Sequence, residues 1–208
     1  MRYYRLLMNK RLIIRYLIIA FMYAAVLYPL WVRLSRSQWS FDSTRILFNL
    51  FPLFGLAAFS ILWLHVMSGV FEPFLRKYID LDTFVRNTAM IVFICLIAHP
   101  LLLLFAVDFN FGTIFSYGKN YIVLGIVGWV LLLTYDIGKL LQRKYNLFVR
   151  HWNKILLVST IGFLLIFFHS LNLGSDVQSG PLRVLWFFYG VTAIIGTIYI
   201  YGIKRFLK

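Results

Sequence analysis

Two histidines, His99 and His169, are the residues of this sequence best suited to chemistry, because each interrupts a long apolar run. His99 lies in the segment ICLIAHPLLLLF and His169 in the segment GFLLIFFHSLNLG. A titratable ring within a membrane is costly and is usually retained with a partner. Imidazole is also the commonest protein ligand of haem iron and of most transition metals. The pair is therefore predicted to supply the two axial ligands of one haem.

The two histidines are expected at a similar depth, in the outer half of the bilayer, given the topology that the charges predict below. Gly162, seven residues before His169, is expected on nearly the same helix face, where it leaves room for a porphyrin edge. Pro100 directly follows His99 and is expected to free backbone carbonyl groups of its helix. The alternative is that each histidine only hydrogen-bonds a neighbouring helix.

The other two histidines, His65 and His151, are expected nearer the cytoplasmic side. They are candidates for an inner haem or metal pair, or for a quinone contact. The alternative, that these two histidines bind no ligand, is stronger here. RHWNK around His151 is typical of an interfacial anchor, and His65 can be a histidine whose hydrogen bonds are satisfied within the bundle. Asp136 is an acid close to the inner end of an apolar run. We expect it to form an ion pair with Lys139 or Arg143, or to relay a proton to an inner site.

The elements that hold these residues are predicted to be membrane-spanning helices. The chain of 208 residues is 62% hydrophobic and only 13% charged, whereas a water-soluble domain carries roughly 25% charged residues. Apolar runs of about 18 residues or more indicate spanning helices. Six such runs use almost the whole chain, at about 16–33, 46–70, 88–107, 120–138, 155–173 and 184–203. The predicted fold is an all-α polytopic bundle, forming one domain over residues 1–208.

The formal charge of +14 is explained by topology. Sixteen of the 21 Lys and Arg residues lie in the segments on one side of the predicted spans, and this side includes both termini. The positive-inside rule places that side in the cytoplasm, and the charge favours anionic lipid. A nucleic-acid partner is not expected. Residues 1–15 are basic, aromatic and amphipathic, and are expected to lie on the cytoplasmic membrane surface.

Three further features narrow the class of protein. Every loop is shorter than about 20 residues, which leaves no room for a flavin or nicotinamide domain. Cys95 is the only cysteine, so no internal disulfide forms, and it is interpreted as a small core residue. No repeat with a period of 20 to 50 residues is visible.

Residues 46–203 resemble the ferric-reductase-like transmembrane domain, which includes the membrane parts of NADPH oxidases, STEAP metalloreductases and bacterial methionine sulfoxide reductase. The segment YNLFVRHWNKILLV, followed by FFHSLNLG, is similar to the family's fifth helix, and YIVLGIVGWVLLLTYDIG to its fourth. The resemblance implies axial haem ligation by His99 and His169. Two-haem members carry a second histidine 13–14 residues earlier on each of these two helices, where this chain has Arg86 and Leu156. One haem b is therefore expected, with a second only if other residues such as His65 and His151 hold it.

The resulting hypothesis is a membrane subunit of an oxidoreductase. It implies a quinol or partner flavoprotein as cytoplasmic donor and a protein or small molecule, such as ferric iron, as acceptor on the outer face. The absence of fused flavin and nicotinamide domains resembles the stand-alone bacterial subunits, which implies a bacterial inner or plasma membrane. The alternative is a non-redox transporter or assembly subunit whose histidines are structural.

Overall fold

The computed structural model contains helices and no strands in the part of the chain that it describes, residues 2–39 and 41–204, with side chains from residue 10 onward. The predicted all-α fold is thus confirmed. The helical elements are α1 (Arg2–Arg36), α2 (Ser43–Val70), α3 (Glu72–Leu75), α4 (Leu81–Ala106), α5 (Phe111–Ser116), α6 (Lys119–Leu141), α7 (Asn146–Arg150), α8 (Trp152–Leu173), η1 (Ser175–Val177), α9 (Gly180–Ile198) and the π-helical turn η2 (Tyr199–Ile203).

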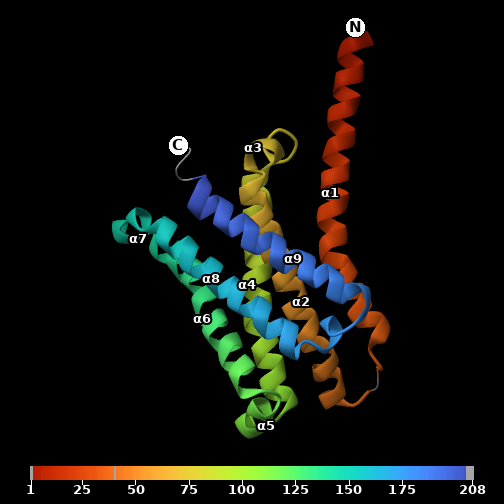
Figure 1. Ribbon diagram of the computed structural model, residues 1–208, viewed down its shortest axis with the longest axis vertical. Coiled ribbons are helices and arrows are strands. Elements are labelled where there is room, and N and C mark those ends of the chain that lie inside the picture. Colours follow the sequence, from red (N-terminus) through yellow and green to blue (C-terminus); the bar gives the residue numbers. More distant parts are fainter. Residues whose placement is uncertain (1, 40, 205–208) are drawn as a thin grey trace.

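Six helices are long and apolar enough to cross a membrane, and each contains one of the six predicted runs almost completely. Their bounds are Lys10–Arg36, Ser43–Val70, Leu81–Ala106, Lys119–Leu141, Trp152–Leu173 and Gly180–Ile203. Length and composition therefore identify a multi-pass membrane protein. In Figure 1 the two ends of the chain, α3 and α7 lie toward one end of the bundle, and α5 lies at the opposite end. We call the first the inner end and the second the outer end, following the charge-based prediction.

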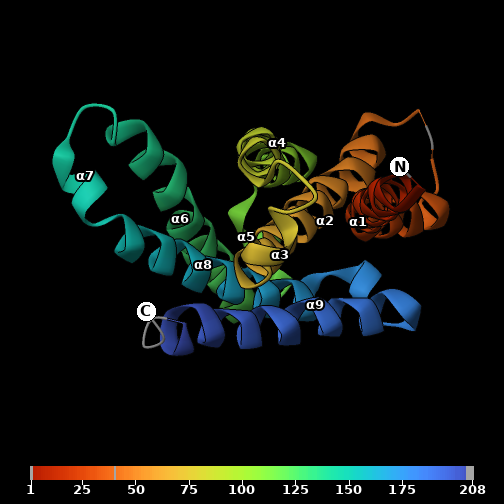
Figure 2. The same ribbon diagram turned by 90° about the horizontal axis from the view of Figure 1, so that it is seen from above.

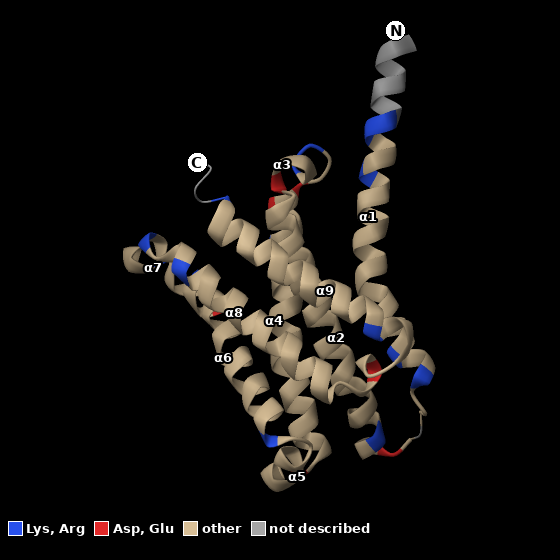
Figure 3. Cartoon of the chain, viewed as in Figure 1, with Lys and Arg blue, Asp and Glu red and all other residues tan. Residues whose placement is uncertain are grey.

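The charged residues agree with the bounds of the spans. In Figure 3 the Lys and Arg residues gather near the helix ends and in the connections, while the spans between them are almost free of charge. Residues 2–15, expected to form a separate surface segment, continue the same helix as the first span. As a result α1 projects beyond the rest of the bundle at the inner end (Figure 1).

Short polar side chains set the starts of three helices. The carboxylates of Asp42 and Asp80 accept hydrogen bonds from backbone N–H groups three residues later, at 2.9 and 3.0 Å, at the starts of α2 and α4. The side-chain oxygen of Asn110 does the same at α5, at 3.1 Å. Each cap satisfies a backbone donor that the helix itself leaves without a partner.

The helices are arranged as two tightly packed hairpins, α2 with α4 and α6 with α8, against which α1 and α9 pack. Viewed from above, the hairpins lie at an angle to each other and α9 crosses below both of them (Figure 2). Gly128 and Gly162 face each other across the second hairpin, where a Cβ on Gly162 would lie 2.7 Å from the backbone oxygen of Gly128. Small residues at this position let the two backbones approach closely.

Stacked aromatic rings join α2, α8 and α9 at the centre of the bundle. Trp63 stacks on Tyr189 with ring centroids 4.1 Å apart, and Phe59 stacks on Trp186 at 4.3 Å and on Phe163 at 4.7 Å. All five side chains are almost fully buried. Offset stacking of this kind contributes beyond the area it buries.

Three prolines inside helices release backbone carbonyl groups that other helices then use. A helical proline lacks the N–H that would bond the carbonyl four residues earlier. For Pro29, Pro52 and Pro100 these are the carbonyls of Ala25, Phe48 and Leu96. They accept hydrogen bonds from the Tyr189 hydroxyl at 2.8 Å, the Arg33 guanidinium at 2.8 Å and the Trp129 indole at 2.8 Å, respectively. The expectation that Pro100 frees a carbonyl is therefore confirmed, and the same device recurs in α1 and α2.

Candidate functional site

His99 lies on α4 and is held against the outer part of α2. Its Nδ1 atom lies 2.8 Å from the backbone oxygen of Phe51. The ring covers Gly55, where an added Cβ would lie 3.0 Å from Nδ1. The Phe51 ring lies beside the imidazole, with centroids 5.4 Å apart. His99 is thus positioned by one backbone carbonyl, one glycine and one aromatic ring.

His169 lies on α8 and is held against the outer part of α6 in the same way. Its Nδ1 atom lies 2.8 Å from the backbone oxygen of Tyr121. The ring covers Gly125 so closely that an added Cβ would overlap it. Both histidines are only partly buried in the protein.

These two arrangements are copies of each other, displaced by 70 residues along the chain. Phe51, Gly55 and His99 in the first hairpin correspond to Tyr121, Gly125 and His169 in the second. In both, the histidine and the carbonyl that it contacts are 48 residues apart. The two hairpins run in the same direction through the bundle (Figure 1), as parallel repeats do in some transporters. The displacement of 70 residues is longer than the 20 to 50 residues typical of solenoid repeats.

The repeat is faint in the sequence. Between residues 43–107 and 113–177 only eight aligned positions are identical, and the glycine and the histidine are two of them. The remaining shared positions carry apolar side chains, which are common throughout this chain. The signal that could have revealed the repeat is the equal spacing from glycine to histidine, rather than overall similarity.

The hydrogen bonds to backbone oxygens determine which imidazole nitrogen is free. A carbonyl oxygen only accepts, so Nδ1 of each ring must carry the hydrogen and donate it. Nε2 is then left with a lone pair, and no described residue makes a hydrogen bond to Nε2 of His99 or His169. The arrangement therefore presents two oriented nitrogen ligands from two equivalent positions.

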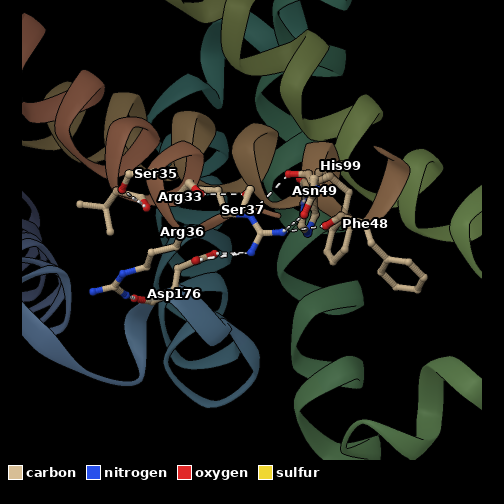
Figure 4. A network of polar contacts seen from close by, with 10 residues as sticks. Arg33, Ser35, Arg36, Ser37, Phe48, Asn49, His99 and Asp176 are labelled. Carbon is tan, nitrogen blue, oxygen red and sulfur yellow. Dashed lines mark hydrogen bonds and ion pairs between the residues drawn. The ribbon is translucent and has the colours of Figure 1, made fainter. Parts of the chain in front are cut away.

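A buried polar network adjoins His99 at the outer end of α1. The guanidinium of Arg33 lies 3.4 Å from the carboxylate of Asp176 and donates to the backbone oxygen of Phe48 at 2.8 Å. The side-chain amide of Asn49 donates to the backbone oxygen of Gln38 at 2.9 Å. Figure 4 shows Arg33 between Asp176 and the residues of α2, with His99 beside Asn49. The network ties α1, α2 and η1 together next to the first histidine.

The structure does not bring His65 and His151 together at a common site. His65 lies on α2, where its Nε2 is 2.7 Å from the hydroxyl oxygen of Thr88 on α4, and it lines a cavity in the inner half of the bundle. His151 lies between α7 and α8, with Nδ1 3.0 Å from the backbone oxygen of Leu147. It is not among the residues that line the cavity.

Asp136 lines the same inner cavity, and its carboxylate makes no ion pair within the described part of the chain. The expected pairing with Lys139 or Arg143 is therefore not observed. The ammonium group of Lys139 instead lies 5.4 Å from the ring centre of Trp152. The cation thus interacts with an interfacial aromatic ring and leaves the acid facing the cavity.

Three further expectations concern the surroundings of the histidines. Gly162 does not provide clearance for a porphyrin, because its open face is taken by the backbone of α6 at Gly128. Leu156, where two-haem proteins of the resembled family carry a histidine, lines the inner cavity. Arg86, at the corresponding place on α4, donates to the hydroxyl of Thr83 at 3.1 Å. Leucine and arginine side chains do not ligate haem iron.

The described residues contain no group of three or more His, Cys, Asp or Glu side chains that could hold a metal ion by themselves. No protein-family model, curated protein or solved structure matches this chain.

Proposed function

We propose that this protein is a membrane electron-transfer protein that carries one haem b, with His99 and His169 as its axial ligands. The observation that carries the proposal is the arrangement repeated at His99 and His169. In each, a backbone carbonyl accepts the hydrogen of Nδ1 and leaves Nε2 free. Haem-ligating histidines need a fixed tautomer and ring orientation, and a hydrogen bond from the second nitrogen is the usual means.

The residues present fit a haem that is held without covalent attachment. The single cysteine, Cys95, rules out a C-x-x-C-H attachment motif. His99 and His169 would provide the two axial nitrogens, while the porphyrin supplies the other four. The bound haem would supply one-electron redox chemistry, and the protein would set its potential through ligation and burial.

The direction of transfer follows from the proposed topology. The two histidines lie in the outer half of the bundle, so an acceptor on the outer face is near, and it can be a small molecule such as ferric iron or a partner protein. Electrons would enter from the cytoplasmic side, from a quinol or a partner flavoprotein. The protein would then serve as the membrane subunit of an oxidoreductase, in a bacterial inner or plasma membrane.

The alternative is a non-redox transporter or assembly subunit in which both histidines are structural. The hydrogen bonds of His99 and His169 to the neighbouring helices are the observation that favours it, because such bonds also stabilise helix packing. The free Nε2 atoms argue for the redox function instead.

The test is a reduced-minus-oxidised spectrum of the purified protein, expressed with sufficient haem, together with haem quantification. We expect an α-band after dithionite and close to one haem per chain. His99→Ala and His169→Ala should each remove the haem or strongly shift its spectrum. The matched controls His65→Ala and His151→Ala should retain it. A colourless wild-type protein, or normal spectra in both outer variants, would contradict the proposal.

A further inference from the structure

A cavity of about 260 Å³ lies in the inner half of the bundle, between α2, α4, α6, α8 and η2. Its walls are mainly apolar, formed by residues such as Leu62, Val92 and Phe163. Polar side chains also line it: His65, Tyr135, Asp136, Ser159, Thr160 and Tyr201. An apolar cavity with a few convergent polar groups is the usual form of a small-molecule site.

The cavity lies between the proposed haem and the inner end. Leu96 and Phe163, at its outer limit, precede His99 and His169 by three and six residues, or roughly 5 and 9 Å along their helices. His65 and Asp136 lie about 15 Å further inward on α2 and α6 than the two glycines beneath the outer histidines. A ligand in this cavity would therefore occupy the part of the bundle that electrons must cross.

The hydrogen bonds of His65 leave an acceptor directed away from Thr88. The Thr88 hydroxyl donates its hydrogen to the backbone oxygen of Phe84 at 2.7 Å. Its oxygen can therefore only accept from His65, whose Nε2 must carry the hydrogen. Nδ1 of His65 then keeps its lone pair and can accept a proton from a bound hydroxyl group.

The repeat places a second polar side chain at the level of His65. His65 on α2 corresponds to Tyr135 on α6 by the same displacement of 70 residues, and Asp136 follows directly. All three line the cavity. Asp136 makes no ion pair or side-chain hydrogen bond within the described chain, so its carboxylate is a second group able to accept a proton.

The chemistry of the walls selects among redox ligands. No Lys or Arg is among the described residues that line the cavity, so the phosphate groups of a flavin nucleotide would find no counter-charge. His65 is the one lining histidine, which leaves a second haem without an axial pair. An uncharged aromatic ring with two hydroxyl groups matches both the apolar walls and the two proton acceptors.

We infer that this inner cavity binds the headgroup of a membrane quinol and that His65 and Asp136 accept its two protons. The inference rests on the proposed function and names the electron donor. Oxidation of one quinol releases two electrons and two protons and leaves the quinone. A haem held by His99 and His169 would be the one-electron acceptor for this oxidation. One proton goes to Nδ1 of His65 and one to the carboxylate of Asp136, and both leave toward the inner end.

The first experiment measures binding without turnover. Full-length protein in quinone-free nanodiscs is irradiated with a photoreactive azidoquinone, and the labelled peptides are mapped by mass spectrometry. We expect labelling on α2, α6 and η2 around the cavity, suppressed by excess decylubiquinone. Labelling that is spread over lipid-facing surfaces and is not suppressed would overturn the inference.

The second experiment measures reduction of the haem by decylubiquinol in stopped flow. We expect Asp136→Asn and His65→Phe to slow the reaction at least about tenfold, because each removes a proton acceptor. The dithionite-reduced spectrum should not change. The matched controls are Asp82→Asn and His151→Phe, which change the same residue types outside the cavity.

The outcomes separate the inference from the proposed function. A normal dithionite spectrum with no quinol-driven reduction and no cavity labelling would overturn the quinol site and leave the haem proposal intact. Protein that lacks haem would contradict the proposed function, whereas specific labelling of the cavity in that preparation would still support quinone binding.

Discussion

Two glycines decide how closely the candidate ligands can approach their partner helices. The ring of His99 lies over Gly55 and that of His169 over Gly125, and each reaches a carbonyl one helical turn earlier. A methyl group at either position would push the imidazole outward. This displacement would break the hydrogen bond that fixes the tautomer before it affected the fold.

We predict that Gly125→Ala impairs haem binding more than Gly55→Ala. An added Cβ would overlap the ring of His169, whereas at Gly55 it would lie 3.0 Å from the ring of His99. Overpacking of this kind costs about 1–3 kcal/mol. The haem-to-protein ratio and the position of the α-band provide the measurement. Gly202→Ala is the control, since an added Cβ there meets nothing within 4 Å. Equal haem content in all three variants would contradict the positioning role.

At the scale of elements, a buried ion pair joins the outer ends of α1, α2 and η1. The Arg33 and Asp176 side chains are 14% and 8% exposed, and the other contacts of Arg33 are hydrogen bonds to α2. A charge in such a place is tolerated because it is paired. Removing one member leaves the other charged and buried.

Asp176→Asn is therefore expected to destabilise the protein by about 3–5 kcal/mol, the usual effect of breaking a buried pair. Thermal unfolding in detergent, followed by circular dichroism, measures this change. Asp82→Asn serves as the control, because Asp82 is 74% exposed and, among the described residues, pairs only with Arg76 at the surface. Similar melting temperatures for the two variants would show that the buried pair does not hold these elements together.

A second charged cluster, at the inner end, links α3 to the start of α4. Arg76 donates to Glu72 at 3.1 Å and to both oxygens of Asp82 at 2.8 and 2.9 Å. The hydrogen bond from Arg76 lowers the pKa of the Glu72 carboxyl group below its ordinary value. Lys204 adds a contact from the end of η2 to Glu72 at 3.4 Å.

This cluster gives a pH-dependent prediction. A carboxyl group whose folded pKa is depressed stabilises the fold above its ordinary pKa, and that contribution is lost as the pH falls through the folded pKa. Arg76→Gln should therefore lower the melting temperature slightly at neutral pH, because the groups are exposed. The difference from wild type should shrink as the pH falls through the depressed carboxyl pKa, and should vanish once the carboxyl group is protonated. A difference that persists at acid pH would show that Arg76 acts through packing.

At the scale of the whole molecule, six spans predict that Arg2 and Lys204 lie on the same side of the membrane. The connection at α7 should share that side, and the connection before α9 should lie on the other. The positive-inside rule assigns the first side to the cytoplasm.

Cysteine labelling tests this orientation. In a Cys95→Ser background, Lys144→Cys is predicted to be shielded from an impermeant maleimide added outside intact cells, and Ser179→Cys to be labelled. The protein is suited to this approach because its one native cysteine is buried. Labelling of Lys144→Cys from outside would reverse the assigned direction of electron transfer.

Much of the fold could be predicted from the sequence, because a bilayer leaves little freedom. Backbone groups in hydrocarbon must be satisfied within each segment, so six apolar runs become six helices and charges between them indicate orientation. His99 and His169 also stood out for this reason, since a titratable ring in an apolar run is costly. Pro100 was predicted to free a carbonyl because its missing N–H is a covalent property of the residue.

Other features depended on which helix packs against which, and only the tertiary structure decided them. Gly162 faces Gly128 rather than a cofactor, and Asp136 faces a cavity while Lys139 covers Trp152. Because contacts between helices depend on rotation about each axis, a single sequence does not determine them. The same reason hid the repeat: the two histidines were visible in the sequence, but their shared carbonyl and glycine emerged only when α2 met α4 and α6 met α8.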